Sequence, residues 1–199
     1  MNRAAVLIPH YNNVAGLLTS LASIDPDDPA DIYVVDDGSP SPPTTDDVAA
    51  AVPGVRQVTV LALPDNVGIE GALNAGLDRI IADGYEYIAR LDCGDRNVGR
   101  RFTTQIAYLD AHPHVLLLGG AALFVDPHGA PLFVRQMPTT HAEIASFMRA
   151  NSAFMHPAVM MRASAAARIG HYPTGFPAAE DYAYFWRFMD AGEVANLPE

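Results

Sequence analysis

Residues 85–95 read YEYIARLDCGD, an apolar run that ends in two carboxylates. The first seven residues have the composition of a buried β-strand, and DCGD is typical of a four-residue turn with Asp first and Gly third. A turn explains DCGD completely. The same turn would also bring Asp92 and Asp95 together, so that both carboxylates could bind one hard cation such as Mg²⁺ or Mn²⁺.

The pattern of an apolar strand followed by polar residues recurs along the N-terminal half. We expect further strands at 4–9, 31–36 and 55–63. Helices with an apolar stripe are expected at 14–23, from Asp46, at 69–82 and at 100–111. Strands that alternate with helices predict an α/β fold, a Rossmann-like and mostly parallel sheet flanked by helices. Ligands bind such sheets beyond the carboxyl ends of the strands, where this chain repeatedly places acids.

The C-terminal half continues the alternation less regularly. We expect strands at 115–125, 131–135 and about 158–162, and helices at about 140–150, 163–169 and from about 179. A length of 199 residues suits a single domain, 1–199. Half of the residues are hydrophobic, which is enough for a core without disulfides, and Cys93 is the single cysteine.

The charge of the chain excludes several classes of protein. The net charge is −11, which argues against binding nucleic acid, and all 12 basic residues are arginines. Without lysine there is no Walker-type phosphate loop and no Schiff-base chemistry. A bound phosphate would have to be neutralised by arginine, by helix N-termini or by a metal cation. No apolar run is long enough to span a membrane and no signal peptide precedes the first strand, so we expect a cytoplasmic protein.

Two motifs in the N-terminal half are candidates for ligand binding. VVDDGS at 34–39 places Asp36 and Asp37 after a strand, as an ordinary turn or as acceptors for a nucleotide's base or ribose. NVGIEGALNAG at 66–76 begins with Asn66 and opens a helix near Gly68. Its glycines are explained by loop and packing positions, but a helix N-terminus can also face a phosphate.

Two further candidates lie in the C-terminal half. AAEDYAYFWRF at 178–188 places Glu180 and Asp181 in the first turn of a helix. Acids at this position complement the helix dipole, and the same dipole would keep Asp181 ionised, as a general base requires. His156 precedes Pro157 in MHPAVMMR at 155–162, where a lone histidine is usually a structural hydrogen-bonding residue.

Taken in order, these motifs resemble family 2 glycosyltransferases, which have the GT-A fold. The resemblance rests on VLIPHYNN at 6–13, VVDDGS at 34–39, NVGIEGALNAG at 66–76, RLDCGD at 90–95, FMHPAVMMR at 154–162 and AAEDYAYFWR at 178–187. It implies an enzyme that transfers a sugar from a nucleotide-diphosphate donor to an acceptor hydroxyl, usually with inversion. A divalent cation, Mg²⁺ or Mn²⁺, would assist, and the acceptor would be a glycan or a lipid-linked molecule. Such an enzyme could lie at the inner membrane face as a peripheral protein.

The resemblance also implies a role for each matching residue. Asp181 falls on the family's catalytic base, while Asp92 and Asp95 fall in its metal-and-ribose acid motif. The remaining assignments concern the nucleotide sugar: Pro9 and Tyr11 shape the base pocket, Asp36 or Asp37 contacts the base or ribose, Asn66 and Gly68 open the following helix, Glu180 lies beside the base, and His156 lies near the donor phosphates or the acceptor.

Two departures from the family pattern keep an alternative open. Gly94 stands where relatives usually carry an acid, and the second acid is displaced to Asp95. The chain also ends soon after the helix of Asp181, where relatives usually continue, so we expect either a C-terminally truncated form or a minimal enzyme. The alternative is a non-catalytic nucleotide-sugar-binding or assembly module. A nucleotidyltransferase is a third reading, but IPHYNN offers none of the glycines and basic residues of that class's N-terminal loop.

Overall fold

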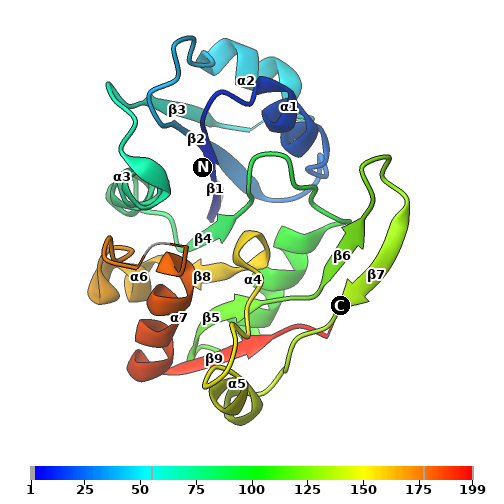
Figure 1. Cartoon of the computed structure of the whole chain (residues 1–199), viewed down its shortest axis with the longest axis vertical. Helices are drawn as coiled ribbons and strands as arrows, with labels where there is room; N and C mark the ends of the chain where they lie inside the picture. Colours follow the sequence, from blue (N-terminus) through cyan, green and yellow to red (C-terminus); the bar gives the residue numbers. More distant parts are fainter. Residues whose placement is uncertain (1–2, 55, 177, 199) are drawn as a thin grey trace.

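The computed structural model describes residues 3–54, 56–176 and 178–198. Its centre is a seven-stranded sheet with the order β3-β2-β1-β4-β8-β5-β9 (Figure 1). The strands are, in that order, β3 (Val58–Ala62), β2 (Ala30–Asp36), β1 (Ala4–His10), β4 (Tyr87–Arg90), β8 (Met160–Arg162), β5 (Val115–Gly119) and β9 (Glu193–Asn196). Only β8 runs antiparallel to its neighbours, so the predicted mostly parallel sheet is confirmed.

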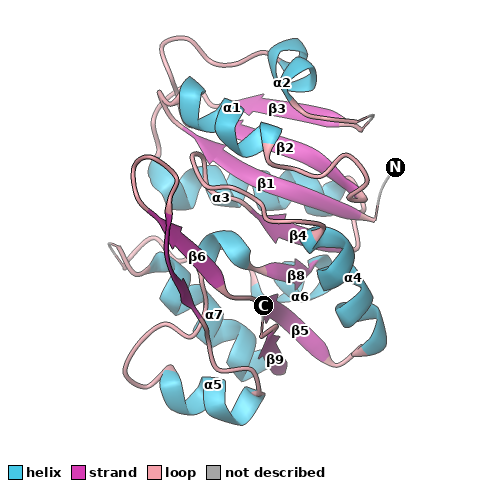
Figure 2. Ribbon diagram, turned by 90° about the vertical axis from the view of Figure 1, so that its right-hand side faces the viewer, coloured by secondary structure: helices cyan, strands magenta, loops and turns pink. Residues whose placement is uncertain are grey.

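Helices cover both faces of this sheet, as Figure 2 shows. One face packs against α1 (Val14–Ala22), α2 (Thr45–Ala51) and α4 (Arg101–Ala111), and the other against α3 (Gly68–Ala82), α5 (His141–Phe147), α6 (Ala163–Ile169) and α7 (Glu180–Ala191). Successive side chains of β1 alternate between these two cores, with Leu7 on the α3 side and Val6 and Ile8 on the α1 side. A strand covered on both faces requires such a continuous apolar run.

The strand predicted at 115–125 is wrong, because this run forms two strands in two different sheets. After β5 the chain leaves the central sheet at Gly119, and β6 (Ala122–Val125) pairs with β7 (Pro131–Arg135) in a separate hairpin. A Cβ at Gly119 would clash with the side chains of Asn196 and Phe154. The glycine therefore permits the close approach of β9, which lies against β5 at the edge of the sheet.

Other boundaries differ by smaller amounts. The third strand begins at Val58, and residue 55 of its predicted range lies outside the described residues. The strand expected from about 158 begins at Met160, because Pro157 lies in a 3₁₀ turn, η1 (His156–Ala158), which precedes it. The edge strand β9 was missing from the sequence prediction. None of the helices in the described ranges is long and apolar enough to cross a membrane.

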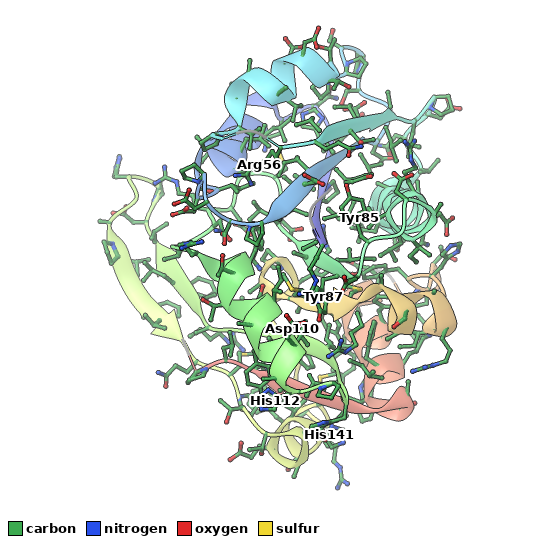
Figure 3. All side chains as sticks on the ribbon, turned by 180° about the vertical axis from the view of Figure 1, so that it is seen from behind. Arg56, Tyr85, Tyr87, Asp110, His112 and His141 are labelled. Atoms are coloured by element: carbon green, nitrogen blue, oxygen red, sulfur yellow. The ribbon has the colours of Figure 1, made fainter. Side chains whose placement is uncertain are left out.

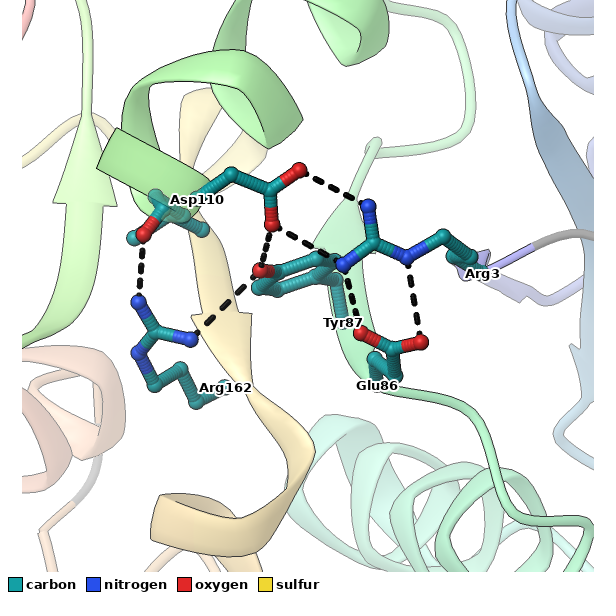
Figure 4. Close-up of polar contacts among 6 residues, drawn as sticks. Arg3, Glu86, Tyr87, Asp110 and Arg162 are labelled. Carbon is teal, nitrogen blue, oxygen red and sulfur yellow. Dashed lines mark hydrogen bonds and ion pairs between the residues drawn. The ribbon is translucent and has the colours of Figure 1, made fainter. Parts of the chain in front are cut away.

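A polar network ties the start of β1 to β4 and α4 (Figure 4). Two of its members, Tyr87 and Asp110, are labelled in Figure 3. Arg3 donates hydrogen bonds to both Glu86 and Asp110, with N···O distances of 2.6–3.0 Å, and the Tyr87 hydroxyl donates to Asp110 at 2.6 Å. The ion pairs are about half exposed, so each contributes little by itself. The bidentate geometry of Arg3 fixes the end of the sheet opposite to the carboxyl ends of β1 and β4.

Candidate active site

A cavity of about 470 Å³ lies beyond the carboxyl ends of the parallel strands β1 and β2 and of their neighbour β4. The chain runs from β1 outward to β2 and β3, and then returns to β4 on the other side of β1. This reversal of strand order is the switch point at which ligands bind open α/β sheets. The lining residues are Pro9, His10, Tyr11, Asp37, Asn66, Gly68, Ile69, Ala72, Asp92, Cys93, His156 and Glu180.

Eight of the eleven residues singled out from the sequence line this cavity. The other three are Asp36, Asp95 and Asp181. The chain thus brings together residues from the ends of β1, β2 and β4, the start of α3, the turn η1 and the start of α7. Such convergence from distant parts of the sequence is what a binding site of an α/β protein requires.

The two acids at the end of β2, Asp36 and Asp37, have different surroundings. Asp36 is fully buried and accepts hydrogen bonds from His10 Nδ1 at 2.6 Å and from the Ser39 hydroxyl at 2.6 Å. Burial alone would raise the pKa of Asp36, but the hydrogen bonds from Ser39 and His10 outweigh it and hold the pKa below its usual value. Asp36 therefore fits a supporting role behind the cavity, whereas Asp37 lines it.

Asp37 also fixes the start of helix α3. Its carboxylate accepts hydrogen bonds from the backbone amides of Val67 at 2.8 Å and Gly68 at 3.1 Å. These are two of the amides that a helix N-terminus leaves without an intrahelical partner. Asp37 thus locks the carboxyl end of β2 to α3 and holds Gly68, which has a φ of +85°, at the cavity.

The turn predicted for DCGD is confirmed. The Asp95 amide donates to the Asp92 carbonyl at 3.0 Å, and Gly94 has the positive φ of +108° that the turn requires. The Ser20 hydroxyl of α1 donates to the Asp92 carbonyl at 3.1 Å and accepts from the Gly94 amide at 2.8 Å. Ser20, which the sequence analysis missed, therefore anchors the turn from the neighbouring helix.

The turn from Asp92 to Asp95, which we call the acid turn, offers two carboxylates to a cation. No group of three or more His, Cys, Asp and Glu side chains that could hold a metal ion occurs within the described residues. Loss of water around the turn and the negative charge of Asp92 raise the pKa of Asp95. Mg²⁺ and Mn²⁺ commonly take one or two protein carboxylates and complete their coordination with substrate phosphates and water. The donor set of Asp92 and Asp95 therefore suits a cation that binds together with a phosphate ligand.

Arg90 is the polar residue at the centre of this region, and it was not assigned a role from the sequence. It is fully buried at the end of β4, and it donates to the Leu7 carbonyl at 2.5 Å and to His156 Nε2 at 3.3 Å. Its third contact is an ion pair with Asp92. The available sequence signal was the arginine that ends the apolar strand YIAR.

His156 is held neutral at the cavity wall. Burial and the positive charge of Arg90 lower the pKa of His156 to about 3. Its Nε2 atom lies 3.0 Å from the hydroxyl of Tyr172, which is buried. Because its ring is uncharged at physiological pH, His156 can contact a ligand through a hydrogen bond but not through an ionic attraction.

Glu180 and Asp181 begin helix α7, as predicted. Glu180 lines the cavity, and Asp181 lies next to it in the chain with a half-buried side chain. Burial raises the pKa of Asp181, and the negative charge of Asp92 adds to the shift, although a hydrogen bond from the Tyr182 amide at 2.6 Å opposes it. The start of α7 therefore carries a carboxylate with more basic character than an ordinary exposed aspartate.

Comparison with known sequences supports this reading of the motifs. The sequence pattern of the family "Glycosyl transferase family 2" matches residues 5–170. The chain is 33% identical over 153 residues to the amylovoran biosynthesis glycosyltransferase AmsE of Erwinia amylovora, a match that covers 76% of this chain and 56% of the relative. It is 32% identical over 142 residues to an uncharacterized glycosyltransferase of Haemophilus influenzae, covering 70% and 51%. The chain therefore spans about half the length of these relatives.

Solved structures of other proteins share the fold. S. aureus TarS 1–349 in complex with UDP-GlcNAc superposes with a TM-score of 0.73 at 20% identity, over 99% of this chain and 56% of that one. The mannosyltransferase PcManGT from Pyrobaculum calidifontis, in complex with GDP-Man and Mn²⁺, gives a TM-score of 0.63 at 16% identity, over 100% and 55%. On the match over residues 5–170, this chain belongs to glycosyl transferase family 2.

Proposed function

We propose that the protein transfers a sugar from a nucleotide-diphosphate donor to an acceptor hydroxyl, with inversion at the anomeric carbon. The observation that carries the proposal is the cavity at the switch point, which gathers Asp37, Asp92, His156 and Glu180 from four separate elements. Family membership supports the transfer of a sugar, and the cavity supports this edge of the sheet as the proposed site. A polysaccharide precursor or lipid-linked glycan is the proposed acceptor, which would place the protein in the cytoplasm at the inner membrane face.

The donor is proposed to lie with its nucleoside between β1 and β2 and its diphosphate toward the acid turn. Pro9 and Tyr11 would flank the base, and Asp37 would accept a hydrogen bond from the base or the ribose. Tyr11 is half exposed at the rim and has an aromatic face available for stacking. Asn66 and Gly68 would face the donor at the start of α3. This part of the cavity wall is held by the hydrogen bond from the Gly68 amide to Asp37.

A divalent cation, Mg²⁺ or Mn²⁺, is proposed to be held by Asp95 and Asp92. Burial raises the pKa of Asp95 and the negative charge of Asp92 adds to the shift, so a shared cation would favour the ionised form of Asp95. When bound, such a cation offsets the negative charge that develops on the leaving diphosphate. This contribution is needed because the chain has no lysine and its acids dominate this edge of the sheet.

Asp181 is proposed as the general base. The acceptor oxygen attacks the anomeric carbon, its proton passes to the Asp181 carboxylate, and the nucleoside diphosphate leaves with the electron pair of the glycosidic bond. Inversion follows from a single displacement of this kind. The raised pKa of Asp181 suits the role, since a base is most effective when its pKa approaches the working pH.

The first experiment is a thermal-shift screen with UDP, GDP and dTDP, each with Mn²⁺ or with EDTA. The proposal expects one diphosphate to stabilise the protein in Mn²⁺, by about 2.7 kcal/mol at a hundredfold excess over Kd. Equal stabilisation in EDTA would contradict the metal requirement. Failure of every diphosphate to bind would contradict the donor assignment.

A non-catalytic nucleotide-sugar-binding module is the second candidate. The observation that favours it is Gly94, which leaves the acid turn with two carboxylates where relatives usually have a further acid. Hydrolysis of a bound nucleotide sugar by the purified protein, at a slow but measurable rate in Mn²⁺, separates the two candidates. Binding without hydrolysis or transfer would favour the module.

A further inference from the structure

We propose that Arg90 is a positioning residue of the donor site, which fixes the Asp92 carboxylate and the His156 ring relative to each other. The expected effects on nucleotide binding rest on the proposed function. The geometry rests on the contacts of Arg90 alone. Arg90 is fully buried, and its guanidinium contacts the Leu7 carbonyl, Asp92 and His156. One rigid group thereby joins β1, the acid turn and η1.

The first consequence concerns Asp92. Its Oδ1 atom is committed to Arg90, so a ligand in the cavity meets mainly Oδ2. The guanidinium also neutralises much of the Asp92 charge, which makes Asp92 a weaker partner for a divalent cation than Asp95. The two acids of the turn therefore have different roles. Asp92 offers a ligand one oriented oxygen, and Asp95 offers the uncompensated negative charge.

The second consequence concerns the tautomer of His156. An arginine side chain has N–H donors and no acceptor, so the contact of Arg90 Nε with His156 Nε2 requires Nε2 to accept. The single ring proton of the neutral histidine must then lie on Nδ1. The Tyr172 hydroxyl, 3.0 Å from Nε2, can only donate to the same atom.

The far end of this chain of contacts is also fixed. Asn74 of α3 donates to the Tyr172 carbonyl at 3.1 Å and accepts from the Tyr172 amide at 2.7 Å. Asp92, Arg90, His156 and Tyr172 therefore form a continuous series between the acid turn and α3. Arg90 and Tyr172 both contact Nε2 of His156, and together they set the tautomer and the orientation of its ring.

A lysine could not replace Arg90 in this arrangement. The three contacts of Arg90 use Nε, Nη1 and Nη2 separately, and the planar fork holds them at fixed angles. An ammonium group keeps the positive charge but offers one point of contact. Arg90→Lys thus removes the fork while leaving Asp92 near a positive charge, which makes it the most informative substitution.

The first test uses the wild-type protein and needs no ligand. Long-range ¹H–¹⁵N correlation spectra of the histidine rings distinguish protonated from unprotonated nitrogens, and the signals lost in His156→Asn identify His156. We expect His156 in the Nδ1–H form from about pH 6 to about pH 8. Protonation of Nε2 over that range would overturn the proposed geometry.

The second test is a double-mutant cycle of Arg90→Lys and Asp92→Asn. We expect Arg90→Lys to weaken Mn²⁺-dependent nucleotide binding roughly tenfold, and to change it by less than about threefold when Asp92 is already Asn. Additive losses would show that Arg90 does not act through Asp92. If Arg90→Lys does not fold, the histidine tautomer of the wild type decides the proposal.

Arg162→Lys is the matched control. Arg162 also donates to backbone carbonyls, those of Val115, Leu109 and His112, but it lies beside Tyr87 at the start of β4, away from the cavity at the carboxyl end of that strand. We expect Arg162→Lys to lower the free energy of unfolding and to leave nucleotide affinity unchanged. If Arg162→Lys weakens nucleotide binding as much as Arg90→Lys does, Arg90 has only a structural role. If the wild type binds no nucleotide, the proposed function fails. In that case the free energy of unfolding is measured for the same double-mutant cycle. Additive effects of Arg90→Lys and Asp92→Asn on this free energy would overturn the pairing of Arg90 with Asp92.

Discussion

Asp181→Asn is the substitution that most directly tests the proposed chemistry. The Asp181 Oδ1 atom accepts a hydrogen bond from the Tyr182 amide at 2.6 Å, and an asparagine Oδ1 can accept the same bond. The start of α7 therefore keeps its contact while the proton acceptor is lost. Loss of a general base lowers the rate by roughly 10²–10⁴-fold. We expect transfer to fall by that factor with donor affinity unchanged.

The same substitution has a defined effect on stability. Burial raises the pKa of Asp181 in the native protein. Between the pKa of the unfolded chain and the higher native pKa, the native state binds more protons, so the contribution of this group to the free energy of unfolding decreases as pH rises. At neutral pH the ionised Asp181 carboxylate therefore lowers the free energy of unfolding. Asp181→Asn should leave the free energy of unfolding unchanged or increase it.

Asp190→Asn is the control for this experiment, because Asp190 is exposed near the other end of the same helix. Removing a negative charge near a helix C-terminus should stabilise by about 0.3–1 kcal/mol and leave transfer unchanged. In the wild type, kcat/KM should fall with decreasing pH through a pKa above that of an ordinary aspartate. Turnover of Asp181→Asn at the wild-type rate, or a large loss of donor affinity, would refute the assignment of Asp181 as the base.

The acid turn, the donor cavity and the back of the sheet each give a further expectation. Asp95→Ala should abolish most Mn²⁺-dependent nucleotide binding and Asp92→Ala less, because Arg90 already neutralises Asp92; Mn²⁺ titrations with nucleotide that match the wild type for both variants would exclude a metal site. Asp37→Ala should weaken binding of a nucleoside monophosphate, and the loss of its bonds to the first amides of α3 should cost about 1–2 kcal/mol of stability. Unchanged affinity by calorimetry would leave Asp37 with the helix-capping role alone. Hydrogen bonds from Arg3 and Tyr87 lower the pKa of Asp110 from 3.8 to about 2. The stability that Asp110 adds is therefore present above about pH 4 and lost as pH falls through about 2. Denaturation curves of Asp110→Asn and wild type should converge there, and a difference that is independent of pH would contradict the linkage.

The parallel sheet and most of the site could be read from the sequence for one physical reason. Strands buried on both faces are continuous apolar runs, and the residues that follow them lie at one edge of the sheet. The run at 31–36 thus located Asp37, and the run at 85–91 located Asp92. Local turn chemistry gave the rest of the acid turn, because Gly94 adopts a positive φ that follows from DCGD alone.

What could not be read depends on contacts between segments far apart in the chain. Nothing local distinguishes Asp36, which is paired with His10, from the cavity-lining Asp37 beside it, and both are buried. The anchoring of the acid turn by Ser20 crosses 72 residues of sequence. Strand β9 carries two apolar residues in four, and only its pairing with β5 makes it a strand.

The pairing of charges within the site explains how an acidic cavity can receive an anionic ligand. The Asp37 carboxylate is satisfied by the amides at the start of α3, and the Asp92 carboxylate is paired with Arg90. Among the described residues, no hydrogen bond or ion pair involves the carboxylates of Asp95 or Glu180, and the Asp181 carboxylate accepts only from two backbone amides, its own and that of Tyr182. The uncompensated negative charge is therefore concentrated at two places, the acid turn and the start of α7. The proposed reaction needs an uncompensated carboxylate for two purposes, to hold a cation beside the leaving diphosphate and to take a proton from the acceptor.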